Sequence, residues 1–327
     1  MKLLATGGAG YIGSTVVRSL LADGHDVIVY DNLGKGHREA VPTGVALVEG
    51  DTADNNKLEL VLQQHRPEAV LHFAGFIEAG ESMRVPEKYF RNNSAATFTL
   101  LEAMLTAGVD KLIFSSTAAV YGEPRRIPIA ETDPLEPTNV YGESKLLVER
   151  VLSWLARIHG LRYASLRYFN AAGSDGHSGE CHDPETHLIP LVLKAAAGAI
   201  DSISIFGTDY PTADGTCIRD YIHVSDLARA HVLALEALTR RSPLIYNLGN
   251  GRGFSVRQVI EAARRVTGRP IHVIESPRRP GDPAVLVASA EKIRRELGWV
   301  PEQCDLDSII ASAWEWMQRH PLAYGRH

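Results

Sequence analysis

The chain has 327 residues, of which 45% are hydrophobic and 22% are charged. This length suggests two domains, or one large domain with an appendage, and the composition excludes a disordered chain. A formal net charge of −5, spread along the sequence, excludes the basic footprint of a nucleic-acid-binding protein.

No apolar run reaches the roughly 18 residues that would predict a membrane span. The first residues, MKLLATGGAG, lack the apolar core and the cleavage site of a signal peptide. Three cysteines, Cys181, Cys217 and Cys304, lie far apart and form no CxxC motif, so they indicate no disulfide framework. We therefore expect a cytoplasmic protein without a membrane partner.

The first half of the chain alternates short apolar segments with amphipathic ones. The short segments at 2–6, 26–30, 45–49, 69–73, 111–115 and 163–169 predict strands, and those at 11–22, 58–65, 93–107 and 141–159 predict helices. Strands that alternate with helices are typical of βαβ units and of a parallel sheet covered on both faces. The sequence therefore predicts an α/β fold, a Rossmann-like doubly wound parallel sheet.

After Asn170 the pattern changes. Residues 171–187 are rich in Gly, Ser, His and acidic residues and predict a loop. Helices are expected at 188–198, 256–267, 290–297 and 306–319, and short strands at 202–206, 244–248 and 271–274. We expect a first domain over residues 1–170 and a smaller mixed α/β domain over 171–327, with the chain returning to the first near 221–238.

The segment TGGAGYIG at residues 6–13 follows the first strand and opens the first helix. Glycines let a backbone turn sharply and approach a pyrophosphate, which the free N–H groups of the helix start can then bind. Asp31 ends the second strand, where a carboxylate would hold the adenosine ribose hydroxyls and repel a 2′-phosphate. The pattern predicts an NAD site; the alternative is a glycine-rich turn beside a surface aspartate.

Tyr141 and Lys145 begin the long helix at 141–159, and their i,i+4 spacing places both on one face. A lysine ammonium lowers the pKa of a nearby phenol, which would make Tyr141 a usable base. Three hydroxyl residues, 115–117, end the strand before this helix and would border the crevice of an open sheet. The alternatives are an exposed Tyr–Lys pair and a simple cap of the next turn.

The loop at 171–187 carries six potential ligands, His177, Cys181, His182, Asp183, Glu185 and His187. Their spacing fits no standard metal motif, and no second pair follows. The sequence therefore predicts a polar loop over the site and no metal.

With these motifs in place the chain resembles the extended short-chain dehydrogenase/reductase family, and within it the UDP-sugar 4-epimerases. The resemblance spans essentially the whole chain. Its carriers include TGGAGYIGS, YDNL, FSSTAAVYG, YGESK and LRYFNAAG, and in the second half IFGTDYPTADGTCIRDYIHVSDLA and RRPGDPA. The two last segments are the more specific to the epimerases.

The resemblance implies an isomerase that interconverts UDP-galactose and UDP-glucose in galactose metabolism, through a 4-keto intermediate and with tightly bound NAD. It implies the catalytic residues Tyr141, Lys145 and Thr117. It implies an NAD-binding domain with the cofactor residues Gly7, Gly10, Tyr11, Ile12, Gly13, Asp31, Asn32, Asp51, Thr52, Phe73, Ala74, Gly75, Asn93, Tyr141, Lys145 and Phe169. It implies a UDP-sugar-binding domain in which Asn170, His187, Leu188, Ser204, Phe206, Arg219, Arg279 and Asp282 join Thr117 and Tyr141 on the substrate.

The sequence departs from some family members at three positions. Thr117 stands where many carry Ser, which keeps the hydroxyl. Ile77 stands where some carry a Lys on the cofactor phosphates, and Leu286 stands where the residue limits room around the 2-substituent of the sugar. An epimerase of UDP-N-acetylhexosamine, UDP-glucuronate or a UDP-pentose therefore stays open, as does a non-catalytic NAD-binding protein.

A dehydratase of the same superfamily is disfavoured, because Ala118 and Ala119 follow Thr117 where an acid and a base would be needed. The resemblance also implies a homodimer, formed through the helices predicted at 93–107 and 141–159.

Overall fold

The computed structural model describes residues 1–279, 281–321 and 323–324. Its largest sheet has seven parallel strands in the order β10-β6-β5-β4-β1-β2-β3. They are β1 (Lys2–Thr6), β2 (Asp26–Asp31), β3 (Ala46–Glu49), β4 (Ala69–His72), β5 (Lys111–Thr117), β6 (Arg162–Tyr168) and β10 (Leu244–Leu248). This topology confirms the Rossmann-like class, and the strand order reverses direction at β1, where such folds bind ligands.

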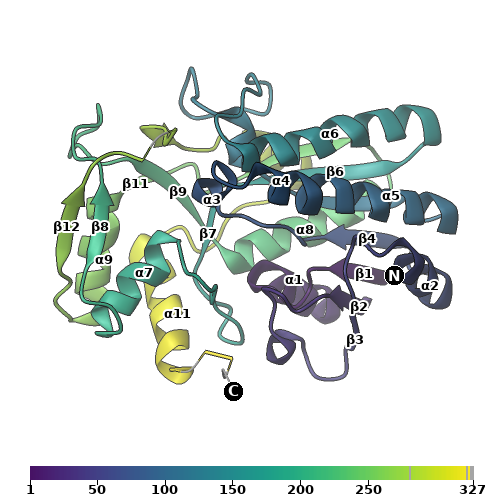
Figure 1. Cartoon of the computed structure of the whole chain (residues 1–327), viewed down its shortest axis with the longest axis horizontal. Helices are drawn as coiled ribbons and strands as arrows, with labels where there is room; N and C mark the ends of the chain where they lie inside the picture. Colours follow the sequence, from purple (N-terminus) through teal and green to yellow (C-terminus); the bar gives the residue numbers. More distant parts are fainter. Residues whose placement is uncertain (280, 322, 325–327) are drawn as a thin grey trace.

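Helices cover both faces of this sheet (Figure 1). Successive residues of a strand point to opposite faces, so Leu3 packs in one core cluster and Leu4 in the other. The first cluster contains side chains from α1 (Tyr11–Ala22) and α8 (Val224–Leu238). The second contains side chains from α2 (Asn55–His65), α5 (Ala96–Ala107) and α6 (Val140–His159).

The segment before α5 differs from the sequence prediction. A helix was expected from residue 93, but α5 begins at Ala96, because Phe90–Ala95 winds as a π-helical turn, labelled η2. Two short helices that the sequence did not predict, α3 (Ala79–Ser82) and α4 (Pro86–Tyr89), lead into it. A π-turn places an extra residue in the helix and often occurs at functional sites, and here it carries Asn93.

The second half forms a smaller mixed layer (Figure 1). Strands β8 (Ile203–Phe206) and β12 (Val273–Ser276) pair in parallel, and α7 (Leu188–Ala196), α9 (Val256–Thr267) and α11 (Leu306–Arg319) share one apolar core with them. A further sheet joins β7 (Asn170–Ala172), β9 (Ile218–His223), β11 (Gly253–Ser255) and β13 (Val285–Leu286). The sequence did not predict this sheet, because its strands are short and β9 carries charged residues.

The chain returns to the large sheet after residue 223, as α8 on one face and β10 at the edge. Ile293 of α10 (Glu291–Leu297) and Trp299 also lie in the core of that face. The division into two domains near residue 170 stays a prediction. The segments α8, β10 and α10 and the residue Trp299 come after residue 170 but pack on the large sheet. Among the described residues, no helix has the length and apolar character needed to cross a bilayer.

Candidate active site

A cavity of about 440 Å³ opens at the carboxyl ends of β1, β2, β4, β5 and β6. Its wall combines the glycine loop, the end of β2, the segment after β4 and the start of α6. On the opposite side the wall continues into the loop between β7 and α7. The topology therefore brings sequence segments that lie far apart to one crevice.

Two glycines of the loop are required by close packing. A Cβ on Gly7, whose φ is +74°, would lie 2.4 Å from the Ala74 nitrogen, and one on Gly13 would lie 2.3 Å from the Gly7 oxygen. Side chains at these positions would force the strand ends and α1 apart. Gly7, Gly10, Tyr11, Ile12 and Gly13 all line the cavity, and Gly10 caps the N-terminus of α1 without a side chain over it. The first N–H groups of α1 are thus available to an anionic group.

Asp31 ends β2 in the cavity wall, almost fully buried, and its carboxylate accepts hydrogen bonds from the backbone N–H groups of Ala9 and Leu33, both at 2.9 Å. Burial raises the pKa of Asp31, and these two bonds act against that rise. Asn32 and Thr52 line the same part of the cavity. Asp51 is outside its lining and instead accepts a hydrogen bond from the Asn32 side chain at 2.8 Å.

The segment after β4 forms the next part of the wall. Phe73, Ala74, Gly75 and Phe169 line the cavity, as the sequence predicted for a cofactor site. Asn93 does not line it and is fully buried behind this segment, where its side chain accepts from the Phe76 nitrogen at 2.8 Å and donates to the Phe76 oxygen at 2.9 Å. Asn93 therefore positions the wall, and the π-turn aims it there.

Thr117, Tyr141 and Lys145 meet in the same cavity. Thr117 is the last residue of β5, and α6 presents the other two on one face, as their spacing predicted. Burial raises the pKa of Tyr141, the interaction with the Thr117 hydroxyl lowers it, and the Glu78 carboxylate adds to the rise. Burial also lowers the pKa of Lys145 to about 8. In this structure Thr117 is the group that lowers the pKa of Tyr141, so the predicted action of Lys145 on that phenol stays a prediction.

The predicted substrate residues divide into two groups. Asn170 and His187 line the cavity, and the Asn170 side chain also donates to the Asp220 carbonyl at 3.1 Å. The others, Leu188, Ser204, Phe206, Arg219, Arg279 and Asp282, lie outside its lining in the smaller layer.

The predicted substrate residues outside the cavity lining include two arginines, each in contact with another residue of the set. The Arg279 guanidinium lies 3.9 Å from the centroid of the Phe206 ring, and Arg219 forms an ion pair with Asp282. Arg219, Arg279 and Asp282 all act on the pKa of the Cys217 thiol, which places the two pairs near one another. Arginines suit a diphosphate, and an aromatic ring can stack on a base.

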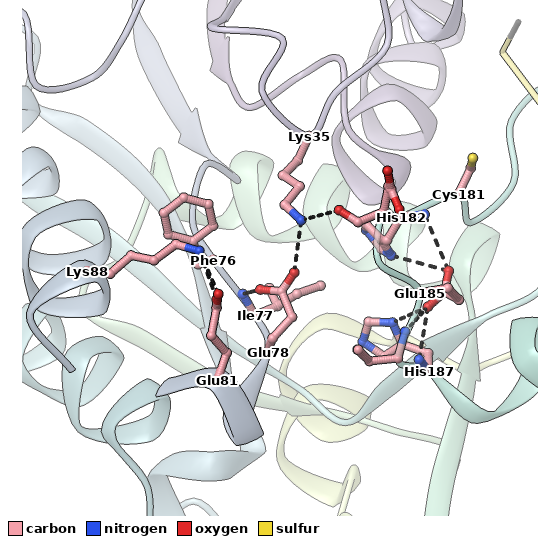
Figure 2. Close-up of polar contacts among 12 residues, drawn as sticks. Lys35, Phe76, Ile77, Glu78, Glu81, Lys88, Cys181, His182, Glu185 and His187 are labelled. Carbon is pink, nitrogen blue, oxygen red and sulfur yellow. Dashed lines mark hydrogen bonds and ion pairs between the residues drawn. The ribbon is translucent and has the colours of Figure 1, made fainter. Parts of the chain in front are cut away.

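Several residues of the wall were not predicted from sequence. Lys35 lies in the lining, donates to the Asp183 carbonyl at 2.7 Å and pairs with Glu78 at 3.3 Å (Figure 2). Ile77, where the resemblance placed a lysine in some relatives, lines the same cavity, so Lys35 supplies a cation there from another loop. Glu180 and His182 also line it. No spacing rule in the sequence would have found these residues, because their proximity arises from loop packing.

A family model and a curated relative both match this chain and agree on its family. The family model of the NAD dependent epimerase/dehydratase family matches residues 3–249. A UDP-glucose 4-epimerase from Lacticaseibacillus casei is 50% identical over 328 residues, covering 99% of this chain and 99% of the relative.

Solved structures agree with this match. The UDP-glucose 4-epimerase from Brucella ovis, in complex with NAD, superimposes with a TM-score of 0.93 at 47% identity, covering 96% of this chain and 97% of that one. The enzyme from Bifidobacterium longum, in complex with NAD+ and UDP, superimposes with a TM-score of 0.94 at 39% identity, covering 98% and 99%. The chain therefore belongs to the NAD dependent epimerase/dehydratase family, and within that family it resembles UDP-glucose 4-epimerases over its whole length.

Proposed function

We propose that this protein interconverts UDP-galactose and UDP-glucose through a 4-keto intermediate and retains NAD through the cycle. The observation that carries the proposal is one cavity that joins a dinucleotide-type glycine loop, Asp31 and the trio Thr117, Tyr141 and Lys145. The similarity to UDP-glucose 4-epimerases supports the choice of sugar nucleotide.

The cavity fits NAD by its shape and donor set. Gly7 and Gly13 allow the glycine loop to pack closely on its neighbouring backbone, and the first N–H groups of α1 would hold the pyrophosphate. The Asp31 carboxylate would accept hydrogen bonds from the adenosine ribose hydroxyls. Bound NAD+ would supply the hydride acceptor for C4 of the sugar and return the hydride to the opposite face of the ketone.

The chain's own part is proton transfer and orientation. Tyr141 would take the proton from the sugar O4 as C4 is oxidised and return it on reduction. The Thr117 hydroxyl lowers the pKa of that phenol against the larger effect of burial. Lys145, buried beside it, would hold the nicotinamide ribose and favour the phenolate when it is charged. All three groups therefore act at the face of the cavity where β5 ends.

We also propose the two-domain division by role. Residues 1–170, with the later return, would bind NAD, and residues 171–327 would hold UDP through Arg219, Arg279 and Phe206. A UDP held there, outside the cofactor cavity, would act as the fixed pivot about which the sugar turns to offer each face of C4.

The proposal predicts turnover without added cofactor. Purified protein should convert UDP-galactose to UDP-glucose, measured by chromatography of the products. Tyr141→Phe should lower kcat about 10²–10⁴-fold while leaving bound NAD in place. Tyr163→Phe, at a buried tyrosine of β6 in the core of the sheet, is the matched control and should retain turnover. Turnover of Tyr141→Phe at the wild-type rate would refute the mechanism.

An N-acetylated substrate is a second candidate, because Leu286 packs against a cluster that contains Phe169 of the cavity wall. The same assay with UDP-N-acetylgalactosamine decides it. Conversion at a rate comparable to that of UDP-galactose would extend the activity, and no conversion would restrict it to the unsubstituted hexoses.

We further propose that the protein is a cytoplasmic homodimer that pairs through α5 and α6. Two apolar residues one turn apart on α6 support the dimer, since Trp154 and Ile158 are 59% and 67% exposed. The widely separated cysteines fit a reducing compartment.

A further inference from the structure

We propose that Glu180, His182, Glu185 and His187 form a binding site for a divalent metal ion of the zinc class, a role beyond the proposed epimerase reaction. One potential ligand atom from each residue lies within 4.8 Å of all the others. The four residues belong to the loop between β7 and α7, and Glu180, His182 and His187 line the cofactor cavity. Figure 2 shows His182, Glu185 and His187 together in this loop.

The distances between these atoms match a coordination shell. The His187 Nδ1 lies 2.8 Å from Glu180 and 3.1 Å from Glu185, and the His182 Nδ1 lies 3.4 and 3.7 Å from the same two carboxylates. Four ligands about 2.1 Å from a tetrahedral zinc ion lie about 3.4 Å from one another. Both imidazoles thus direct their Nδ1 to the same two carboxylates, through Oε1 of Glu180 and through different oxygens of Glu185, so the four groups gather in one small region.

Charge supports a cation at that point. The side chains of Glu180 and Glu185 are only 9% and 2% exposed, and two adjacent buried carboxylates need compensating positive charge. Within the described residues, their ion pairs are with His182 and His187, and no lysine or arginine joins them. A divalent ion with two neutral imidazoles would make the cluster neutral beside a cavity suited to a diphosphate.

The Nδ1 atom of His182 is a further feature that fits a metal ligand. This atom is buried and has no hydrogen-bond partner among the described residues. An imidazole nitrogen can offer a lone pair to a metal ion. A metal ion in this position would use a nitrogen that makes ion-pair contacts with two carboxylates but no hydrogen bond to the described residues.

The carboxylate of Glu185 is also held in place from behind. Its Oε1 accepts hydrogen bonds from the backbone nitrogens of Thr186 at 2.8 Å and of His187 at 2.9 Å, and its Oε2 accepts one from the backbone nitrogen of His182 at 3.3 Å. Such outer contacts typically orient the ligands of metal sites. The same loop is tied to the first layer by Lys35 and by the contact of His37 with the Cys181 carbonyl at 3.2 Å. A bound ion would therefore fix the wall that closes over the cofactor.

The test is metal binding by the purified, NAD-containing protein. After removal of metal with EDTA and desalting, zinc is titrated against a chromophoric chelator, and bound zinc is counted by plasma mass spectrometry. We expect one zinc per chain, with at least 100-fold weaker binding in His182→Gln and in Glu185→Gln. His177→Gln, an exposed histidine of the same loop outside the cluster, is the matched control and should bind like the wild type.

X-ray absorption at the zinc edge of the wild-type protein keeps the proposal testable if the variants do not fold. It should report two imidazole nitrogens and two oxygens at about 2.0–2.1 Å and no sulfur. The proposal is overturned if the wild type binds no more zinc than His182→Gln, or if sulfur enters the shell. The cluster would then be a pair of imidazolium–carboxylate contacts.

Discussion

The hydroxyl of Thr117 partly offsets the rise that burial causes in the pKa of Tyr141, the proposed base. The Thr117 side chain is almost fully buried, accepts from the Ala119 nitrogen at 3.1 Å and lowers the pKa of Tyr141 against the effect of burial. A hydroxyl that donates to a phenolate stabilises the charged form and so lowers the pKa. Removing it should raise the pKa of Tyr141.

We therefore expect Thr117→Ala to reduce turnover of UDP-galactose about 10-fold or more near neutral pH. Because the pKa of Tyr141 rises, the limb on which activity increases with pH should move to higher pH. Thr117→Ser keeps the hydroxyl and should keep the wild-type profile. The measurement is kcat against pH for the three proteins, and coincident profiles for Thr117→Ala and Thr117→Ser would contradict the role of the hydroxyl.

The buried side chain of Lys145 is expected to lower the free energy of unfolding of the protein at neutral pH. Burial lowers its pKa from 10.5 to about 8, so between these values the unfolded chain holds a proton that the folded chain has released. The free energy of unfolding should therefore rise as pH increases through that window, and the stability missing at pH 7 is roughly 3 kcal/mol.

Replacing Lys145 tests whether the free energy of unfolding rises with pH because of this lysine. Lys145→Met, freed of nucleotide, should be more stable than the wild type at pH 7 and should lose the extra slope above pH 8, while its turnover is strongly reduced. Denaturant unfolding of both proteins from pH 7 to 10 measures the difference. Parallel curves would show that the buried ammonium is not penalised.

At the scale of elements, Asp220 joins β9 to the turn between β10 and β11 and to the segment after β13. It is fully buried on β9, and its carboxylate accepts hydrogen bonds from the backbone nitrogens of Asn250 at 2.7 Å, Gly251 at 3.0 Å and Ala288 at 3.1 Å. These bonds hold the turn between β10 and β11 and the segment after β13 against β9. The position is next to Arg219, so the carboxylate also fixes a proposed substrate residue.

In Asp220→Asn an amide NH₂ group can replace the carboxylate oxygen that accepts from the backbone nitrogens of Gly251 and Ala288. An NH₂ group donates and cannot accept these bonds. We expect the variant to lose about 2–3 kcal/mol of stability, because buried N–H groups are left unsatisfied. Asp209→Asn, whose side chain is 75% exposed, should change stability by less than about 1 kcal/mol. Urea unfolding monitored by circular dichroism measures both, and equal effects would refute the special role of Asp220.

The strongly periodic elements were predictable from sequence, and the irregular ones were not. The helices Val256–Thr267 and Leu306–Arg319 begin and end where the apolar pattern predicts, and α9 starts with a capping box at Ser255. The π-turn at Phe90–Ala95 could not be foreseen, because it has a helix-like sequence and its register is set by packing around Asn93. The three-residue strands β7 and β11 are too short to carry a period.

At the scale of the whole molecule, the predictable part of the site is the part that is local in sequence. The glycine loop with Asp31 and the pair of Tyr141 with Lys145 rest on spacing, and the structure gathers them in one cavity. Lys35 reaches the cavity only because its loop packs on the β7–α7 loop. The convergence of Glu180 with His187 depends on how that loop turns, so linear ligand spacing could not predict it.

Helix α6 carries an exposed apolar face through which two chains can pair. Trp154 and Ile158 lie one turn apart on α6 and are 59% and 67% exposed, and Arg157 covers only part of the Trp154 ring, at 5.3 Å from its centroid. Large apolar side chains grouped on an exposed helix face are typical of a contact between proteins, and a two-fold axis pairs such a face with its own copy. The neighbouring helix α5 lies alongside α6 on the same side of the sheet (Figure 1).

Light scattering coupled to gel filtration should therefore give the wild type twice the mass of one 35.7 kDa chain. The double variant Trp154→Glu and Ile158→Glu should run as a monomer at low micromolar concentration, because two buried charges at such an interface would each lack a partner. Leu60→Glu, on α2 and 62% exposed, is the control for a generic surface charge and should leave the mass unchanged. A monomeric wild type would exclude the homodimer. A double variant that stays dimeric would show that the dimer contact lies elsewhere than on the apolar face of α6.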